Sequence, residues 1–161
     1  MEMEQFDVST AFLHGNLEEI IFVEPPEGLN IDKERSCLLL RKSLYGLKQA
    51  PKSWNSKFDE TMKLLDFRSI LSDKCVYISE IPKIIVAVYV DDGVMMAQSR
   101  KICLNVIRQL NQHFTTKRMH NNMFLGTEIV QSATSVTLGH TRYAKEATVD
   151  RVECSKVTES K

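Results

Sequence analysis

The sequence of 161 residues contains no cysteine pattern that would build a disulfide framework or a zinc site. Its four cysteines are widely separated and include no C-x-x-C pair, and its four histidines complete no zinc-binding spacing. Structural zinc sites and small disulfide scaffolds are recognised by short, regular spacings of these residues. We therefore expect free thiols in a reducing, intracellular setting. The cysteines are Cys37, Cys75, Cys103 and Cys154.

The sequence also lacks long hydrophobic runs and a targeting signal. The apolar run 84–90 is far too short to span a bilayer. The first ten residues, MEMEQFDVST, have neither the basic segment nor the apolar core of a signal peptide. We therefore expect an intracellular protein, cytoplasmic or nuclear, with no membrane partner. With 43% hydrophobic and 26% charged residues, the composition is that of one globular domain with a sizeable core.

Charge is balanced overall but unevenly distributed. Residues 1–34 carry nine acidic residues and one lysine, whereas residues 35–70 carry eight basic and three acidic residues. A solvated surface with charges of both signs would produce this pattern. The alternative is an acidic wall facing a basic strip, as a cation site beside a bound phosphate chain requires.

Two segments show the 3.6-residue apolar period of an amphipathic helix. The first spans 51–66, and the second spans 99–114 with Ser99 as its expected N-cap. A third helix is expected at 141–152, and residues 117–122 are expected to be irregular. Strands are expected at 5–12, 20–24, 37–40, 75–78, 84–90, 94–97, 124–130 and 136–138. Because strands and helices do not alternate strictly, the sequence predicts an α+β fold with an antiparallel sheet covered by helices.

Two adjacent carboxylates follow the most apolar of these strands. In the stretch KIIVAVYVDDGVMM, Asp91 and Asp92 come directly after the run 84–90, and the chain becomes apolar again at once. We expect Asp91, Asp92 and Gly93 to form a tight turn, because glycine adopts the positive φ that such turns require. Neighbouring carboxylates repel each other and are costly to remove from water unless a cation is near. A plain surface hairpin and a metal site are both open at this point.

A third carboxylate has similar surroundings. Asp7 lies in FDVSTAFL, on a short expected strand that ends in a bend. Three carboxylates on two adjacent strand ends could hold two Mg²⁺ ions, or Mn²⁺ in their place, about 3.5–4 Å apart for in-line displacement at phosphorus. Magnesium prefers oxygen ligands and keeps several waters, so two or three carboxylates and substrate phosphates suffice. The pattern therefore favours a two-metal site over a plain hairpin.

Longer motifs carry a family resemblance. YVDD at 89–92 and FDVSTAFLHGNLEE at 6–19 resemble the motifs of reverse transcriptases, specifically those of copia-type LTR retrotransposons. More stretches follow in that family's order: VEPPEGL at 23–29, CLLLRKSLYGLKQAPKSW at 37–54, DKCVYI at 73–78 and FLGTEI at 124–129. YVDD alone is a weak match, whereas SLYGLKQAP together with DVSTAFLHG is specific. The resemblance is to the RNA-dependent DNA polymerase domain of a Pol polyprotein, over almost the whole chain.

The resemblance implies a polymerase palm, in which an antiparallel sheet is backed by two amphipathic helices. It assigns residues 1–130 to the palm, and residues 131–161 to the start of the thumb or connection and a frayed tail. Copia-type enzymes carry a fingers segment before the position that matches Asp7 and an RNase H domain after the thumb. Neither is recognisable in these 161 residues. We therefore expect a palm without its fingers, as a fragment of the polymerase.

The resemblance also implies a metal site and its partners. Asp7 and Asp91 match the carboxylates that ligate both metal ions, and Asp92 matches a weaker, supporting carboxylate. The backbone carbonyl of Val8 matches a further ligand. Gly93 stands where the family usually has a bulkier apolar residue. The implied partners are an RNA or DNA template with its primer, deoxynucleoside triphosphates, and other segments of a Pol polyprotein.

Further positions match residues that surround the incoming nucleotide. Phe12 matches the aromatic steric gate that excludes a 2′-hydroxyl, with core packing as its alternative. Tyr45 and Gly46 match the motif beside the nucleotide and the template. Lys48 is either a phosphate contact or a solvated lysine, and Tyr89 matches a contact to the primer terminus or the template backbone.

Two matches lie nearer the C-terminus. Lys117 stands where these polymerases carry a lysine that protonates the leaving pyrophosphate, although Arg118 and His120 replace the Asp and Gly that are usual in the family. Leu125 and Gly126 match the primer grip, a hairpin that steers the primer 3′ end, with an ordinary glycine turn as the alternative.

Three functions are open from the sequence. The first is a reverse transcriptase fragment that adds nucleotides to a primer 3′-OH by two-metal chemistry. The second is a non-catalytic remnant that acts as a nucleic-acid-binding or protein-binding module. The third, outside this family, is a small interaction domain whose acidic turns are surface features.

Overall fold

Two compact units make up the computed structural model, which describes residues 1–30, 32, 36–120, 123–132, 135–140 and 144. The units comprise residues 1–119 and 120–161. The first unit contains every expected site residue except Leu125 and Gly126, which belong to the second. The helix expected at 141–152 lies outside the described residues, apart from Ala144.

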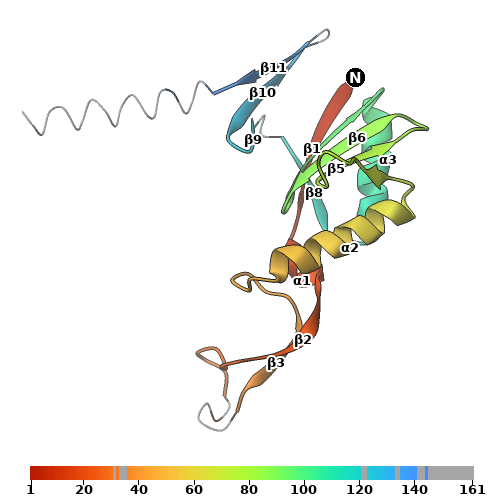
Figure 1. Ribbon diagram of the computed structural model, residues 1–161. Helices are drawn as coiled ribbons and strands as arrows, with labels where there is room; N and C mark the ends of the chain where they lie inside the picture. Colours follow the sequence, from red (N-terminus) through yellow and green to blue (C-terminus); the bar gives the residue numbers. More distant parts are fainter. Residues whose placement is uncertain (31, 33–35, 121–122, 133–134, 141–143, 145–161) are drawn as a thin grey trace, which may run out of the picture. The chain divides into compact units, whose positions relative to one another are not determined.

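A six-stranded antiparallel sheet is the framework of the first unit (Figure 1). Its strand order is β4-β5-β6-β7-β1-β8, so the first strand of the chain is inserted between β7 and β8. The strands span Glu2–Val8 (β1), Arg68–Ser69 (β4), Val76–Ser79 (β5), Ile84–Tyr89 (β6), Asp92–Ala97 (β7) and Thr116–Met119 (β8). The antiparallel sheet expected from the sequence is therefore confirmed.

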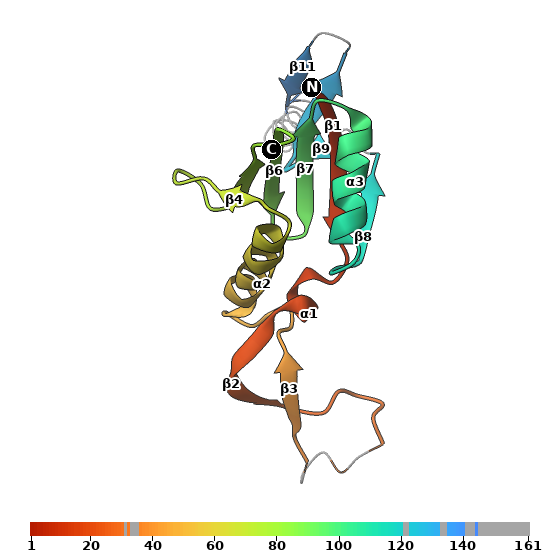
Figure 2. The ribbon, with the colours of Figure 1, turned by 90° about the vertical axis from the view of Figure 1, so that its right-hand side faces the viewer.

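Two longer helices cover one face of this sheet. The helices span Ala11–His14 (α1), Ala50–Leu64 (α2) and Arg100–Leu110 (α3). α3 packs on β1 and β7 and lies in front of β1 in Figure 2. Phe58 of α2 packs edge to face on Tyr77 of β5, with ring centroids 5.6 Å apart. Both helices share one buried cluster with the sheet, as the apolar period predicts, and the opposite face of the sheet is called the second face below.

The N-terminal strand is shorter than expected. β1 ends at Val8 and not at Phe12, because Thr10 has a left-handed φ of 53° and leads into α1. The amide of Ser9 still donates to the carbonyl of Thr115 at 2.8 Å, where the chain leaves the sheet. Phe12 consequently lies on a helix, where it is buried.

The sequence predicts an irregular stretch at 117–122. This prediction is wrong for its first half, because residues 117–119 belong to β8. β8 is an edge strand and pairs with β1 alone. Edge strands tolerate charged side chains, which also discourage further pairing. Lys117 and Arg118 therefore obscure the alternation that would mark this strand in the sequence.

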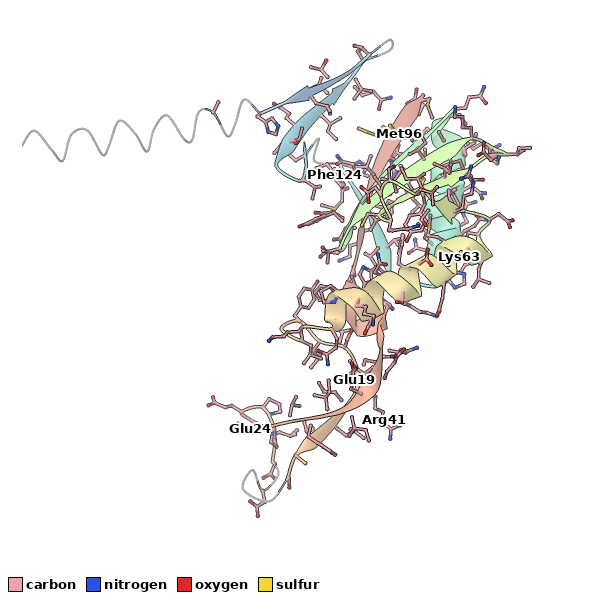
Figure 3. All side chains as sticks on the ribbon, viewed as in Figure 1. Glu19, Glu24, Arg41, Lys63, Met96 and Phe124 are labelled. Atoms are coloured by element: carbon pink, nitrogen blue, oxygen red, sulfur yellow. The ribbon has the colours of Figure 1, made fainter. Side chains whose placement is uncertain are left out.

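A separate hairpin pairs β2 (Asn16–Val23) with β3 (Leu38–Lys42). Phe22 is 60% exposed on this hairpin. Figure 3 shows the charged side chains of Glu19 on β2 and Arg41 on β3. Hairpins of two strands have marginal stability by themselves, so this element depends on its attachment to α1 and α2.

The second unit is a three-stranded antiparallel sheet with the order β11-β10-β9. Leu125 and Gly126 form the two-residue turn between β9 and β10, and both have positive φ, 51° and 74°. Such turns match the natural twist of antiparallel strands. The single strand expected at 124–130 is wrong, because this turn divides it into two. The strands span Met123–Phe124 (β9), Thr127–Gln131 (β10) and Val136–Gly139 (β11).

Two further observations concern the described residues as a whole. None of the helices in them is long and apolar enough to cross a membrane. Cys37, Cys75 and Cys103 are free thiols, and Cys154 lies outside the described residues.

Candidate active site

The β6–β7 hairpin ends in a two-residue turn formed by Val90 and Asp91. Tyr89 of β6 pairs with Asp92 of β7, which closes the turn around these two residues. Val90 has a positive φ of 57°, whereas Gly93 lies within β7 and does not have a positive φ. The turn expected at Asp91, Asp92 and Gly93 is therefore wrong. The turn comes earlier in the chain, and Asp92 is already a strand residue.

Gly93 is required by packing and not by backbone conformation. It pairs with Phe6 of β1, and a Cβ atom built on Gly93 would lie 2.2 Å from Cζ of Phe6 and 2.5 Å from Cε1. Phe6 is 1% exposed, so its ring is enclosed on all sides. No larger residue fits at position 93 while the ring of Phe6 keeps its place.

Four side chains form a row across the second face of the sheet. Tyr89 of β6 pairs with Asp92 of β7, Asp92 pairs with Asp7 of β1, and Asp7 pairs with Lys117 of β8. Paired residues of antiparallel strands project to the same face. The residues on either side of Asp7 are buried in the helix-covered core, so the row faces the opposite side. Asp7 therefore lies between a carboxylate and a lysine on neighbouring strands.

Asp91 adjoins this row from the turn. The amide of Val8 donates to the carbonyl of Asp91 at 2.8 Å. Asp7 and Asp92 are then a non-hydrogen-bonded pair, in which opposed Cα atoms are about 4.5 Å apart. All three carboxylates are partly exposed. The structure thus brings Asp7, Asp91 and Asp92 together at one end of the central strands.

The charges of these carboxylates act on one another. Burial raises the pKa of Asp92 above its ordinary value, and the negative charges of Asp91 and Asp7 raise it further. The pKa of Tyr45 is raised in the same way, first by burial and then by Asp91, with a smaller effect of Asp7. Like charges held together and partly out of water are stabilised by a nearby cation.

A divalent cation fits this group by the chemistry of its donors. Among the described residues, no three His, Cys, Asp or Glu side chains converge as a complete protein site for a metal. Mg²⁺ needs only one or two carboxylates, because waters and substrate phosphates complete its octahedral shell. Asp7 and Asp91 supply such oxygens from adjacent elements. The pKa of Asp92 is raised first by burial and then by the negative charges of Asp91 and Asp7, which a cation would neutralise.

Replacing Asp92 by asparagine is expected to raise the melting temperature of the metal-free protein near neutral pH. The pKa of Asp92 is raised on folding, so the stability that its protonated form provides is present at low pH. That stability is lost as the pH rises through the folded-state pKa. The asparagine side chain does not ionise, and the advantage of the variant should therefore grow between about pH 4 and about pH 8. Thermal unfolding in EDTA at both pH values measures this difference, and an equal advantage at both would contradict the prediction.

Tyr45 and Phe12 lie together beside Asp91. The hydroxyl of Tyr45 donates to Oδ2 of Asp91 at 3.4 Å, and its ring centroid is 4.4 Å from that of Phe12. Phe12 is 9% exposed, and its carbonyl accepts a hydrogen bond from the hydroxyl of Ser43. Phe12 is therefore a core residue that also borders the carboxylates, through Tyr45.

Gly46 shapes the turn that presents Tyr45. The amide of Leu47 donates to the carbonyl of Leu44 at 3.3 Å, and Gly46 has a φ of 95°. A positive φ at the third position is the requirement of a type II turn. Lys48 follows this turn and is exposed.

Arg118 is anchored on the face of β8 opposite to Lys117. Its Nη2 and Nε donate to Oε2 of Glu4 at 2.7 and 3.1 Å, and Nε of Arg100 lies 2.5 Å from Oε1 of the same carboxylate. Glu4 is 7% exposed. The buried carboxylate of Glu4 thus ties β8 and α3 to β1, and these contacts support the register that sets Lys117 beside Asp7. Arg118, which departs from the family pattern, therefore has a structural role through its hydrogen bonds to Glu4.

Trp54 is a neighbour of the site that the sequence pattern does not reveal. Its indole Nε1 donates to the carbonyl of Val90 at 2.7 Å, although the two residues are 36 positions apart. The apolar period of α2 predicts core packing for Trp54, which is confirmed by its 3% exposure. The only signal in the sequence is general: a buried indole N–H requires an acceptor.

Comparison with known proteins gives a consistent set of relatives. The family model described as "Reverse transcriptase (RNA-dependent DNA polymerase)" matches residues 1–159. The chain is 42% identical, over 84% of its length, to the "Retrovirus-related Pol polyprotein from transposon TNT 1-94" of Nicotiana tabacum. It is 34% identical, over 88% of its length, to that from transposon RE1 of Arabidopsis thaliana.

A yeast relative matches over a larger share of its own length. The chain is 34% identical, over 96% of its length, to a putative transposon Ty5-1 protein of Saccharomyces cerevisiae. The matches cover 10% of each of the two plant polyproteins and 52% of the yeast protein. The chain therefore spans a tenth to a half of the length of these relatives.

Proposed function

The chain belongs to the reverse transcriptase (RNA-dependent DNA polymerase) family, and on that premise we propose that its first unit is the palm of an RNA-directed DNA polymerase. Two of the relatives reported above are named retrovirus-related Pol polyproteins from transposons, and the third is named a putative transposon protein. The observation that carries the proposal is the pairing of Asp92, Asp7 and Lys117 on three adjacent strands, with Asp91 in the adjoining turn. We extend the proposed palm beyond this unit to residue 130, and we assign residues 131–161 to the start of the thumb or connection.

The proposed reaction transfers a deoxynucleotide from its triphosphate to a primer 3′-OH on an RNA or DNA template. The bond from the 3′-oxygen to the α-phosphorus forms, and the bond to pyrophosphate breaks. Asp7 and Asp91 would hold the cations, supported by Asp92 and the carbonyl of Val8. When bound, two Mg²⁺ ions would lower the pKa of the 3′-OH and neutralise charge on the phosphates. Lys117 would donate a proton from Nζ to the leaving pyrophosphate.

The residues around the carboxylates would bind the nucleotide and the primer–template. Phe12 would lie under the sugar, and Tyr45 with Gly46 would border the nucleotide and the template. Tyr89, which is 59% exposed at the end of the row, would contact the primer terminus. Lys48 would contact a phosphate. The turn at 125–126 would act as the primer grip.

Replacing Phe12 by valine is expected to admit ribonucleotides. A smaller side chain leaves room for a 2′-hydroxyl, and pockets separate substrates by steric exclusion of single groups. Discrimination should fall by roughly tenfold or more, because one group in a hydrophobic pocket accounts for about that much. Single-nucleotide incorporation of dNTP and rNTP measures the ratio. Unchanged discrimination, with normal use of dNTP, would assign Phe12 to the core alone.

Primer extension tests the proposed function. The chain is mixed with a labelled primer on an RNA template, with deoxynucleoside triphosphates and Mg²⁺, and extension of the primer supports the proposal. Binding to primer–template that weakens with salt, without extension, would instead indicate a nucleic-acid-binding module, since phosphate contacts release counterions. Neither binding nor extension would leave an interaction domain outside polymerase chemistry.

A further inference from the structure

The turn that carries Asp91 has an unfavourable backbone conformation. Val90 has a φ of 57°, in the left-handed region that a β-branched residue rarely adopts. Such conformations persist where the surrounding structure holds them, and they concentrate at functional sites. The turn must therefore be held by contacts from outside the hairpin.

Two such contacts hold the carbonyls of the turn. Nε1 of Trp54 donates to the carbonyl of Val90 at 2.7 Å, and the amide of Val8 donates to the carbonyl of Asp91 at 2.8 Å. The first contact comes from α2 and the second from β1. Each carbonyl of the turn is thus fixed by a different element.

Trp54 is itself held rigidly. It is 3% exposed, and its ring centroid lies 5.0 Å from that of Phe114 and 5.4 Å from that of Phe58. An indole has a single donor and no acceptor, so the position of Nε1 follows directly from the packing of the ring. The same residue also limits α1, because a Cβ at Gly15 would lie 2.9 Å from the backbone nitrogen of Trp54.

We propose that Trp54 is a positioning residue, which holds the Val90 turn so that the carboxylate of Asp91 stays beside Asp7. The inference that this serves cation binding rests on the proposed function. The hydrogen bond by which Trp54 holds the turn does not depend on the proposed function. Trp54 therefore links the position of α2 to two features. One is the Val90 turn with Asp91, and the other is the end of α1, the helix that carries Phe12.

The hydrogen bond can be tested directly in the complete chain. Trp54 is the only tryptophan, so its indole N–H gives a single NMR signal. We expect this proton to exchange with solvent slowly, at least about tenfold more slowly than that of an exposed indole. Exchange at the rate of a free indole would overturn the proposal.

A pair of variants separates positioning from general packing. Trp54→Phe keeps an aromatic ring and removes the donor, whereas Phe58→Leu perturbs the same aromatic cluster on α2 and leaves the indole donor in place. We expect Trp54→Phe to speed amide exchange of residues 91–93 about fivefold relative to the amide of Val86 in the sheet, as the loss of one hydrogen bond implies. Phe58→Leu should leave that ratio unchanged. An unchanged ratio in Trp54→Phe, or an equal change in both variants, would overturn the proposal.

Cation binding then tests the consequence for the site. Mn²⁺ titration of the chain, with Asp7→Asn as reference, shows whether binding requires the carboxylates. Where it does, Trp54→Phe should weaken Mn²⁺ binding about fivefold, and an unchanged affinity would overturn the positioning role. Binding that is insensitive to Asp7→Asn would instead contradict the proposed function, while the exchange ratio still decides whether Trp54 holds the turn.

Discussion

Primer extension is expected to disappear when Asp7 is replaced by asparagine. Asp7 is the one carboxylate that pairs with both Asp92 and Lys117, and in the proposed mechanism it holds both cations. An amide oxygen is neutral and binds Mg²⁺ more weakly than a carboxylate does, so stabilisation of charge in the transition state is lost. We expect a decrease of at least about 10³-fold in the rate of nucleotide addition.

The fold should survive this replacement. Asp7 is partly exposed, and its negative charge raises the pKa of Asp92, so its removal relieves repulsion. The melting temperature in EDTA should therefore equal or exceed that of the parent. Asp66→Asn is the matched control, because Asp66 is exposed and has a φ of 61°, which asparagine also tolerates. Extension at the parental rate by Asp7→Asn would remove the basis of the proposed function.

The second large effect concerns stability. Replacing Gly93 by alanine is expected to destabilise the fold, because the new Cβ would lie 2.2 Å from Cζ of the buried Phe6 ring. The ring is enclosed, so either it or the β1–β7 pairing must move. We expect a loss of about 3 kcal/mol in the free energy of unfolding, and roughly 6–12 °C in melting temperature. Urea unfolding and thermal scans measure both.

A second substitution should rescue this variant. Leucine at position 6 removes part of the ring that overlaps the new Cβ, although Phe6→Leu alone should cost about 1–2 kcal/mol through the cavity it creates. The double variant Phe6→Leu/Gly93→Ala should be more stable than Gly93→Ala alone, with a coupling of about 1–2 kcal/mol. Strict additivity of the two single effects would show that the Phe6 ring is not the obstacle.

The helices and most strands could be predicted from periodicity, and the misses have physical causes. The apolar period located α2 and α3 because each helix buries one side on the sheet. The start of β8 was obscured because edge strands carry charged residues such as Lys117. The sequence places Phe12 on a strand because a threonine does not signal the left-handed conformation, φ 53°, that Thr10 adopts at the bend.

The carboxylates of the site could be identified from motifs, whereas their supports could not. Asp7 and Asp91 occur in recognisable local sequences, and strand pairing places them together. The bond from Trp54 to Val90 joins residues 36 positions apart, and such a contact depends on how α2 packs. The turn itself was misplaced because Gly93 signals a positive φ, while its real constraint is the ring of Phe6.

The enclosed ring beneath Gly93 also imposes an order on evolutionary change. If position 93 already holds a larger side chain, a change to phenylalanine at position 6 costs about 3 kcal/mol, because a Cβ at position 93 would lie 2.2 Å from Cζ of the ring. The reverse order passes through glycine opposite a smaller residue, which leaves a void and costs stability without preventing folding. A later return to a larger side chain at position 93 alone then carries the full cost of the overlap with the ring. The favoured order is therefore a change to glycine at position 93 before a change to phenylalanine at position 6.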